Sequence, residues 1–115
     1  MSKRMWYHKA RLVVRATRLL WQRITRGWSD KETWALDGYI ARFAVPRLKR
    51  FRELTITHPQ KFSDEEWDAL LGDMIYALEV SIIELDDVVG PNGADWDRVE
   101  RGLRAFGEEF RNLWW

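Results

Sequence analysis

Residues 63–89 read SDEEWDALLGDMIYALEVSIIELDDVV, and this stretch decides the fold class. Its apolar residues recur at the three- and four-residue spacing of a single helix face. They are Trp67, Leu70, Leu71, Met74, Ile75, Leu78, Ile82, Leu85 and Val89. Ser63 with Glu66 three residues later forms a capping box, which marks the start of a helix, and Gly90-Pro91-Asn92-Gly93 ends the pattern. The stretch therefore predicts a helix over 63–89.

The segment after this helix predicts its antiparallel partner over 94–115. Apolar side chains follow a strict 3–4 spacing there: Trp96, Val99, Leu103, Phe106, Phe110, Leu113 and Trp114. Gly102 and Gly107 flank the stripe, and the close approach of a neighbouring helix or of a ligand would explain them. We expect 63–89 and 94–115 to form an acidic helical hairpin.

Two basic segments precede the hairpin. Residues 1–26 predict a basic amphipathic helix, which is either part of the core or an extension of it. Gly27 suits the position after its C-terminus. Residues 29–54 predict a second basic helix that starts near Asp30, because Ser29 and Glu32 form a capping box. Its apolar stripe is Leu36, Tyr39, Ile40 and Phe43, and Pro46 is expected to kink or break it.

These patterns predict an all-α fold, a compact bundle of three to four helices. The length of 115 residues suits one domain over 1–115. We expect Trp67, Trp96 and Trp114 to lie in its core. Trp28, Trp34 and Trp115 lie near segment ends, where a Trp suits an interface or a ligand-stacking wall.

The net charge of +1 conceals two oppositely charged halves. Residues 1–58 hold 14 Lys and Arg against four Asp and Glu, whereas residues 59–115 hold five against 14. Three arrangements would explain this asymmetry: the halves pack together in one chain, copies assemble head to tail, or the basic half faces an anionic partner.

Several functional classes are excluded or unsupported. With no Cys, the chain has no disulfide, catalytic thiolate or Cys-based zinc site. No apolar run suits a transmembrane helix, and no secretory signal is recognisable, so we expect a cytoplasmic protein. Neither His8 nor His58 has a ligand partner at i+3 or i+4, so no metal site is expected. No nucleophile, general base or phosphate loop stands out, so the sequence predicts no enzyme and no cofactor.

Binding features are clearer than catalytic ones. Arg4, Arg11, Arg15 and Arg18 form a stripe on the first helix, and guanidinium groups of this kind can grip phosphates, nucleic acid or an anionic membrane surface. A second set of residues combines cations with Trp rings that could stack on a base. It comprises Arg26, Trp28, Trp34, Arg47, Lys49 and Arg50.

A family resemblance comes from the pattern RGWSD, TWxLD, PRLKRF, EEWD and MIYALE within residues 23–115. The pattern resembles small, mostly uncharacterised proteins of tailed bacteriophages. The resemblance implies expression in the cytoplasm of a bacterial host. It also implies an accessory role, one class of which withholds a nucleotide immune signal from the host.

Three hypotheses follow from these features. The first is an oligomeric protein that sequesters a phosphorylated small molecule, with Arg47, Lys49 and Arg50 on the phosphates and Trp28 and Trp34 beside the base. The second is an inhibitor or adaptor that binds a host or phage protein through a Trp-rich surface. The third is a binder of nucleic acid or of a membrane surface that uses the first helix.

Overall fold

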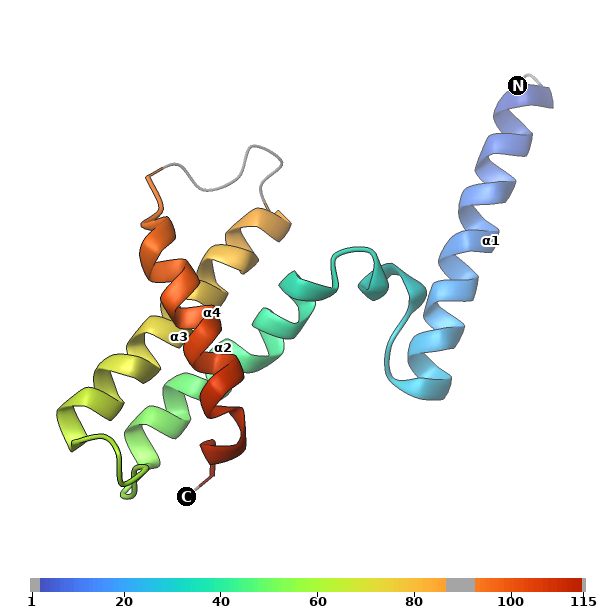
Figure 1. Ribbon diagram of the computed structural model, residues 1–115. Helices are drawn as coiled ribbons and strands as arrows, with labels where there is room; N and C mark the ends of the chain where they lie inside the picture. The colour runs from blue at the N-terminus through green and yellow to red at the C-terminus, as the bar shows by residue number, and fades with distance from the viewer. Residues whose placement is uncertain (1–2, 87–92, 115) are drawn as a thin grey trace. The chain divides into compact units, whose positions relative to one another are not determined.

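The computed structural model describes residues 3–86 and 93–114, and all regular structure in them is helical (Figure 1). The elements in chain order are α1 (Lys3–Arg26), the 3₁₀ turn η1 (Asp30–Thr33), α2 (Leu36–Leu54), α3 (Asp64–Asp86), α4 (Trp96–Glu109) and the 3₁₀ turn η2 (Phe110–Asn112). The prediction of an all-α fold is confirmed. Within the described ranges, no helix is long and apolar enough to cross a membrane.

The chain divides into two compact units, residues 1–36 and 37–115. We call them unit 1 and unit 2 and describe each by itself. Unit 1 holds α1 and η1, and unit 2 holds nearly all of α2 together with α3, α4 and η2. The prediction of a single domain over 1–115 stays a prediction.

In unit 1, α1 ends where the sequence predicts. Gly27 follows Arg26 with a φ of +82°, and its N–H donates to the carbonyl of Arg23 at 2.9 Å. Arg23 and Arg26 lie in the last turn, where cations suit the negative end of the helix dipole. No residue of α1 is buried.

The segment after Gly27 differs from the prediction. The capping box is present, since the Ser29 N–H donates to the Glu32 carboxylate at 2.6 Å, but it caps the short turn η1. The second helix therefore starts at Leu36 and not near Asp30, which corrects its N-terminus. It then continues to Leu54 without a break at Pro46. The kink at Pro46 stays a prediction.

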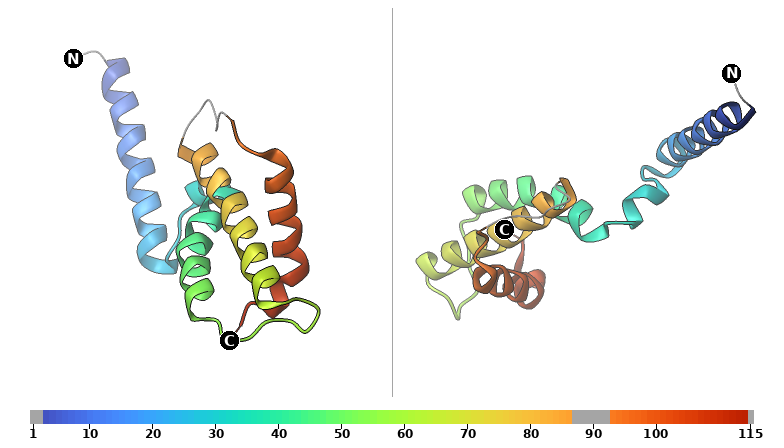
Figure 2. Two further views of the ribbon diagram at one scale, coloured as in Figure 1. Left: turned by 90° about the vertical axis from the view of Figure 1, so that its left-hand side faces the viewer. Right: turned by 90° about the horizontal axis from the view of Figure 1, so that it is seen from above.

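In unit 2, the second capping box starts α3 as predicted. The N–H of Glu66 donates to Ser63 Oγ, and the N–H of Ser63 donates to Glu66 Oε1, each at 3.1 Å. The helix is described to Asp86, so the predicted end at 87–89 lies outside the described residues. Figures 1 and 2 show α3 and α4 running antiparallel, as predicted for the hairpin.

The fourth helix is shorter than predicted. It begins at Trp96 with Asp95 as its N-cap, whose side chain accepts from the N–H of Arg98 at 3.1 Å. It ends at Glu109 and tightens into η2 (Phe110–Asn112), so the regular structure is shorter than the predicted range 94–115.

The core of unit 2 lies where α2 and α4 meet α3. Its main cluster of buried residues is Ala41, Val45, Leu48, Trp67, Leu71, Met74, Ile75, Leu78 and Ala105. Trp67 is only 3% exposed, as predicted, and its ring stacks on Phe62 with 6.0 Å between centroids.

Two predicted apolar faces are only partly buried, since Val99 is buried and Phe106 and Leu113 pack against the core. The buried residues of α2 are Gly38, Ala41, Val45 and Leu48, while its predicted stripe leaves Leu36, Ile40 and Phe43 exposed. The buried residues of α4 are Val99, Gly102, Ala105 and Glu109. The prediction that Trp96 and Trp114 lie in the core is therefore wrong.

Close helix approach explains this correction. A Cβ on Gly102 would press on the Asp73 carbonyl oxygen and lie 2.7 Å from the Ala77 side chain of α3. A Cβ on Gly38 would lie 2.7 Å from the Leu85 Cβ. Small residues therefore lie where α2 and α4 contact α3, and the bulky residues beside them on α2 and α4 point toward solvent. Gly107 has open space around it, so only Gly102 of the two α4 glycines marks a close approach.

Candidate functional site

A groove of about 570 Å³ lies in unit 1 between α1 and η1. Its lining combines side chains from α1, from η1 and from the residue just beyond η1. These residues are Arg15, Arg18, Leu19, Asp30, Lys31 and Trp34. The lining thus includes three cations, one carboxylate and one indole ring.

Asp30 fastens η1 to α1. Its carboxylate accepts hydrogen bonds from Gln22 Nε2 and from the Arg26 guanidinium, each at 2.7 Å. Its backbone N–H donates to Gln22 Oε1 at 2.7 Å. The hydrogen bond from Gln22, followed by that from Arg26, lowers the pKa of Asp30 below its ordinary value. These hydrogen bonds favour the charged carboxylate and fix η1 against α1.

The other groove cations are less engaged. The Arg18 guanidinium lies 3.4 Å from the Asp30 carboxylate, and both side chains are exposed. Within the described part of the chain, neither Arg15 nor Lys31 forms an ion pair. Trp34 is 83% exposed, the highest value among the tryptophans that the structure describes. The groove thus offers two unpaired cations and a free aromatic face.

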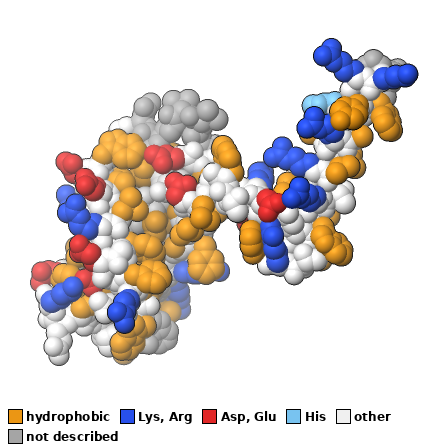
Figure 3. Space-filling model, turned by 45° about the vertical axis from the view of Figure 1, so that its right-hand side comes forward, with side chains coloured by type: hydrophobic (Ala, Val, Ile, Leu, Met, Phe, Trp, Pro, Cys, Tyr) orange, Lys and Arg blue, Asp and Glu red, His pale blue; other side chains and the backbone are white. Residues whose placement is uncertain are grey.

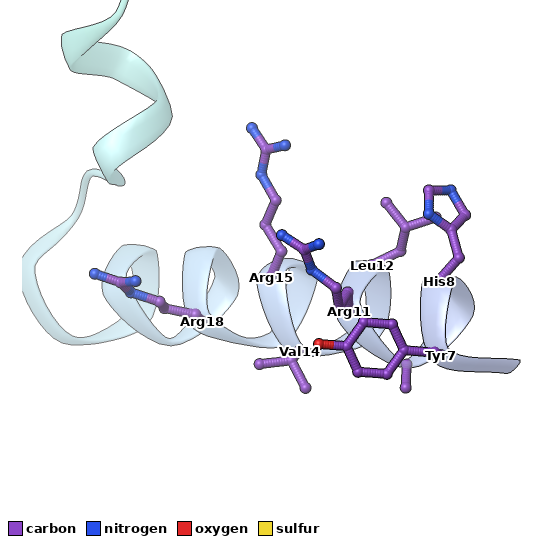
Figure 4. Close-up of a pocket in the computed structure, with 8 residues that line it drawn as sticks. Tyr7, His8, Arg11, Leu12, Val14, Arg15 and Arg18 are labelled. Atoms are coloured by element: carbon purple, nitrogen blue, oxygen red, sulfur yellow. The ribbon is translucent and has the colours of Figure 1, made fainter. Parts of the chain in front are cut away.

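A second hollow, of about 670 Å³, lies along α1 (Figure 4). Its lining residues are Tyr7, His8, Ala10, Arg11, Leu12, Val14, Arg15 and Arg18. All of them belong to one helix, and side chains of one helix cannot enclose a ligand. We regard this hollow as an open surface that continues the groove along the arginine stripe.

The predicted stripe residues all lie on α1. Arg15 and Arg18 line the groove, and Arg11 lines the open surface beside it. Arg4 is exposed nearer the N-terminus of the helix. The C-terminal half of the predicted stripe therefore lines the groove, and the rest of the stripe lies on α1 beyond it.

The predicted ligand set is divided between the two units. In unit 1, Trp34 lines the groove, while the Arg26 guanidinium lies 3.7 Å over the Trp28 ring and donates to the Trp28 carbonyl at 3.1 Å. This contact occupies one face of the Trp28 indole. Arg26 and Trp28 thus stabilise the turn that positions Asp30.

The cations predicted in α2 are engaged within unit 2. Lys49 pairs with Glu79 of α3 at 2.9 Å, and Arg50 pairs with Glu53 at 2.9 Å. Arg47 lies 3.8 Å over the Phe43 ring and donates to the Phe43 carbonyl at 2.8 Å. Each of these cations would have to leave a partner before it could bind a phosphate.

A further hollow of about 430 Å³ in unit 2 is lined by paired charges. It lies beside Lys49, Arg52 and Arg98. Arg52 makes a two-pronged contact with Asp68, with both distances 2.8 Å, and Arg98 donates to Asp73 at 2.9 Å. Arg52 thereby lowers the pKa of Asp68. Because its cations are neutralised, this hollow is a weaker anion site than the groove.

Sequence reasoning missed Lys31 and Leu19 as groove residues. The Ser29–Glu32 capping box could have placed Lys31 in the first turn after the loop, beside the end of the arginine stripe. The expected absence of a metal site is not contradicted. No group of three or more potential ligands occurs among the described residues, and His58 Nε2 lies 3.1 Å from a single carboxylate, that of Asp64.

Comparisons with known proteins identify no relative. No family model matches the chain, and neither a curated protein nor a solved structure is significantly similar to it. The resemblance to bacteriophage proteins therefore stays a prediction.

Proposed function

We propose that this protein binds a small phosphorylated molecule with an aromatic ring in the groove between α1 and η1, and that it does so without catalysis. The observation that carries the proposal is the groove lining: Arg15, Arg18 and Lys31 stand around one site beside the exposed indole of Trp34. The volume of about 570 Å³ lies within the usual range for small-molecule sites.

The groove chemistry suits a phosphate. Arg15 can meet two phosphate oxygens with its planar guanidinium, and Lys31 adds a compact positive charge. The Arg18–Asp30 contact is long and exposed, so it contributes little and can be replaced by a phosphate contact. Asp30 keeps its hydrogen bonds to Gln22 and Arg26 during such an exchange.

The indole of Trp34 suits the aromatic ring of the ligand. An exposed Trp ring can stack on a heterocyclic base at a favourable energy of about 1–3 kcal/mol. Leu19 adds an apolar wall beside it. The combination favours a nucleotide-like ligand over inorganic phosphate.

The biological setting of this proposal comes from the resemblance to phage proteins. We propose an accessory protein that acts in the cytoplasm of a bacterial host and withholds a nucleotide signal by binding it. The proposal no longer assigns the phosphate to Arg47, Lys49 and Arg50. Each of these cations already contacts a carboxylate or an aromatic ring within unit 2.

The test is isothermal titration of the whole protein with AMP, adenosine and inorganic phosphate at low salt. We expect AMP to bind at least tenfold more tightly than either of the other two. Lys31→Ala should weaken AMP binding about tenfold, since a charge-assisted hydrogen bond is worth roughly 1.5–3 kcal/mol. Trp34→Ser should weaken AMP without changing the affinity for phosphate.

Trp21→Ser is the matched control, because Trp21 is another exposed Trp of unit 1 that does not line the groove. It should leave AMP binding unchanged. Equal losses in the Trp21 and Trp34 variants, or no heat with AMP, would contradict the proposal.

A further inference from the structure

The helix α1 carries an apolar face that unit 1 does not cover. Successive residues of a helix are turned by about 100°, which places a set of apolar residues along one side of α1 from its first turn to its last. They are Trp6, Val13, Val14, Leu20, Trp21 and Ile24. Each of them is at least 59% exposed, and Ala10 and Thr17 lie between them. We call this set the α1 face.

The polar contacts within unit 1 use a different side of the helix. The Asp30 carboxylate of η1 accepts hydrogen bonds from Gln22 and Arg26, and it lies 3.4 Å from the Arg18 guanidinium. The helical spacing places these three residues of α1 on the side of the arginine stripe. Figure 3 shows Lys and Arg side chains gathered on one side of α1 and hydrophobic side chains along another. The turn η1 therefore packs on the arginine side and leaves the α1 face exposed.

Cations border the α1 face on both sides. Lys9 and Arg23 lie along one border, by the helical spacing. Arg11 and Arg18 lie along the other. Arg18 and Arg23 also pair with carboxylates of η1 at 3.4 and 3.7 Å, but their side chains stay 71% and 61% exposed. The helix as a whole has eight Lys and Arg and no Asp or Glu, so a partner that covers it must be apolar beneath the α1 face and negative along its borders.

No described helix of unit 2 combines these two properties. The acidic helix α3 has eight Asp and Glu and no Lys or Arg, but among its described residues only one large hydrophobic side chain, Ile83, is exposed. On α2, Ile40 and Phe43 are exposed, but this helix has five Lys and Arg against two acids. Together, α4 and η2 have four Arg against four acids, one of which, Glu109, is buried. Neither the chain's own unit 2 nor that of a second copy therefore matches α1, and a second α1 would repel it.

We propose that α1 lies in the plane of an anionic membrane surface, with the α1 face at the boundary of the acyl chains and the bordering cations on the lipid phosphates. Such a surface supplies apolar material and negative charge side by side. The long side chains of Lys9 and Arg23 can reach the headgroups while their stems cover apolar surface. Trp6 and Trp21 suit the headgroup level, because an indole ring is apolar and carries one polar N–H. The groove lining includes no residue of the α1 face, so the inference does not depend on the proposed function.

A nucleic acid is the main competing partner of this basic helix. Its phosphates would satisfy the arginine stripe, because guanidinium groups bind phosphate oxygens in pairs. A polyanion would leave the α1 face exposed to water, however, whereas a lipid surface covers the apolar side chains and neutralises the bordering cations at once. This difference favours the lipid surface.

The test is co-sedimentation of the whole protein with vesicles of phosphatidylglycerol or of phosphatidylcholine. At low salt we expect binding to phosphatidylglycerol to be roughly tenfold tighter or more, because several cations meet the charged surface. Raising the salt concentration should weaken this binding, since salt screens the attraction between the helix and the lipid phosphates.

Two neighbouring substitutions separate the α1 face from the charge of the helix. Val13→Glu places a carboxylate within the α1 face and should weaken binding to phosphatidylglycerol by roughly tenfold or more. Leu12→Glu is the matched control, because it makes the same change of charge at the adjacent residue, which is 53% exposed and lies outside the α1 face. It should cause a much smaller loss. Trp34→Ser, which alters the groove, should bind vesicles like the wild type, so failure of the groove proposal and failure of this inference are distinguishable.

Several results would overturn the inference. Equal binding to both kinds of vesicle would exclude a role for the bordering cations, and equal losses in Val13→Glu and Leu12→Glu would exclude the α1 face. Absence of vesicle binding overturns it too, and three further measurements then identify the partner of α1. A melting temperature that falls in Val13→Glu but not in Leu12→Glu would assign the α1 face to the chain's own unit 2. A dimer that only Val13→Glu abolishes would assign it to a second copy, and binding of a duplex oligonucleotide would assign α1 to nucleic acid.

Discussion

At the scale of single residues, Glu109 is the most unusual side chain of unit 2. It is 1% exposed, yet it is a carboxylate at the end of α4. Lys61 Nζ lies 2.5 Å from its Oε1, and Asn112 Nδ2 donates to its Oε2 at 2.7 Å. The hydrogen bond from Lys61 is the main cause that lowers the pKa of Glu109 below its ordinary value of 4.5. A buried charge is tolerated here because both oxygens have partners.

Removing the lysine should therefore destabilise unit 2 in a pH-dependent way. We expect Lys61→Met to lower the free energy of unfolding at pH 7 by about 1–3 kcal/mol, because a buried carboxylate loses its charged partner. A lowered folded pKa contributes stability above pH 4.5, and that stability is lost as the pH falls through the folded pKa. Wild type and variant should thus converge in acid, as measured by urea unfolding at pH 7 and pH 3. A difference that stays constant with pH would contradict this account.

At the scale of elements, the α3–α4 contact depends on a glycine. Gly102 faces the Asp73 carbonyl and the Ala77 side chain, so the two backbones approach more closely than bulky residues permit. Tyr76 reinforces the contact, since its hydroxyl accepts a hydrogen bond from the Asp95 N–H at 2.8 Å. The two helices are therefore held together along the small residues of their contact and at the start of α4.

A pair of Gly→Ala variants tests this packing. Gly102→Ala should destabilise unit 2 by about 2–4 kcal/mol, because the new methyl group forces the backbone of α3 away and this outweighs the better helix propensity of Ala. Gly107→Ala is the matched control in the same helix, with no atom near its added Cβ. It should stabilise the protein by about 0.5–1 kcal/mol. Thermal unfolding followed by circular dichroism measures both, and equal effects would refute the close approach.

At the scale of the whole molecule, the stabilising contacts are unevenly shared. Both clusters of buried apolar side chains, such as those around Met74 and Ala77, belong to unit 2, whereas α1 has no buried residue. Unit 1 is held by polar contacts of Asp30 with Arg18, Gln22 and Arg26. Exposed polar contacts of this kind contribute little to stability.

Unit 2 should therefore fold without unit 1. A chain of residues 37–115, studied at a concentration below that of self-association, should unfold cooperatively with a free energy of unfolding within about 1 kcal/mol of the whole chain. A peptide of residues 1–36 should be only partly helical in water, because an isolated helix without a buried face is marginal. Circular dichroism with urea measures both, and loss of cooperative unfolding in 37–115 would contradict this division.

Local interactions explain what could be read from the sequence. The hydrogen bonds of the capping boxes at Ser29 and Ser63 join residues three apart, and that of Gly27 after α1 joins residues four apart. Such local hydrogen bonds follow from residue order alone. The face of α3 that contains Leu71 and Met74 is buried as its spacing predicts. The arginine stripe that the sequence predicts on α1 includes Arg15 and Arg18, which line the groove.

Residue order alone thus accounts for the helical class, the start of α3, the end of α1 and the opposite charges of the two halves. Which side of α4 faces the core depends on helix packing, because Gly102 and Ala105 permit a close approach that Trp96 and Leu103 would prevent. The spacing of apolar residues shows which side of a helix is hydrophobic. It does not show how closely the axis of a neighbouring helix approaches that side. The groove also depends on the fold. Lys31 and Trp34 line it together with Arg15 and Arg18 because the chain turns at Gly27. The hydrogen bond between Asp30 and Gln22 then holds the turn against α1.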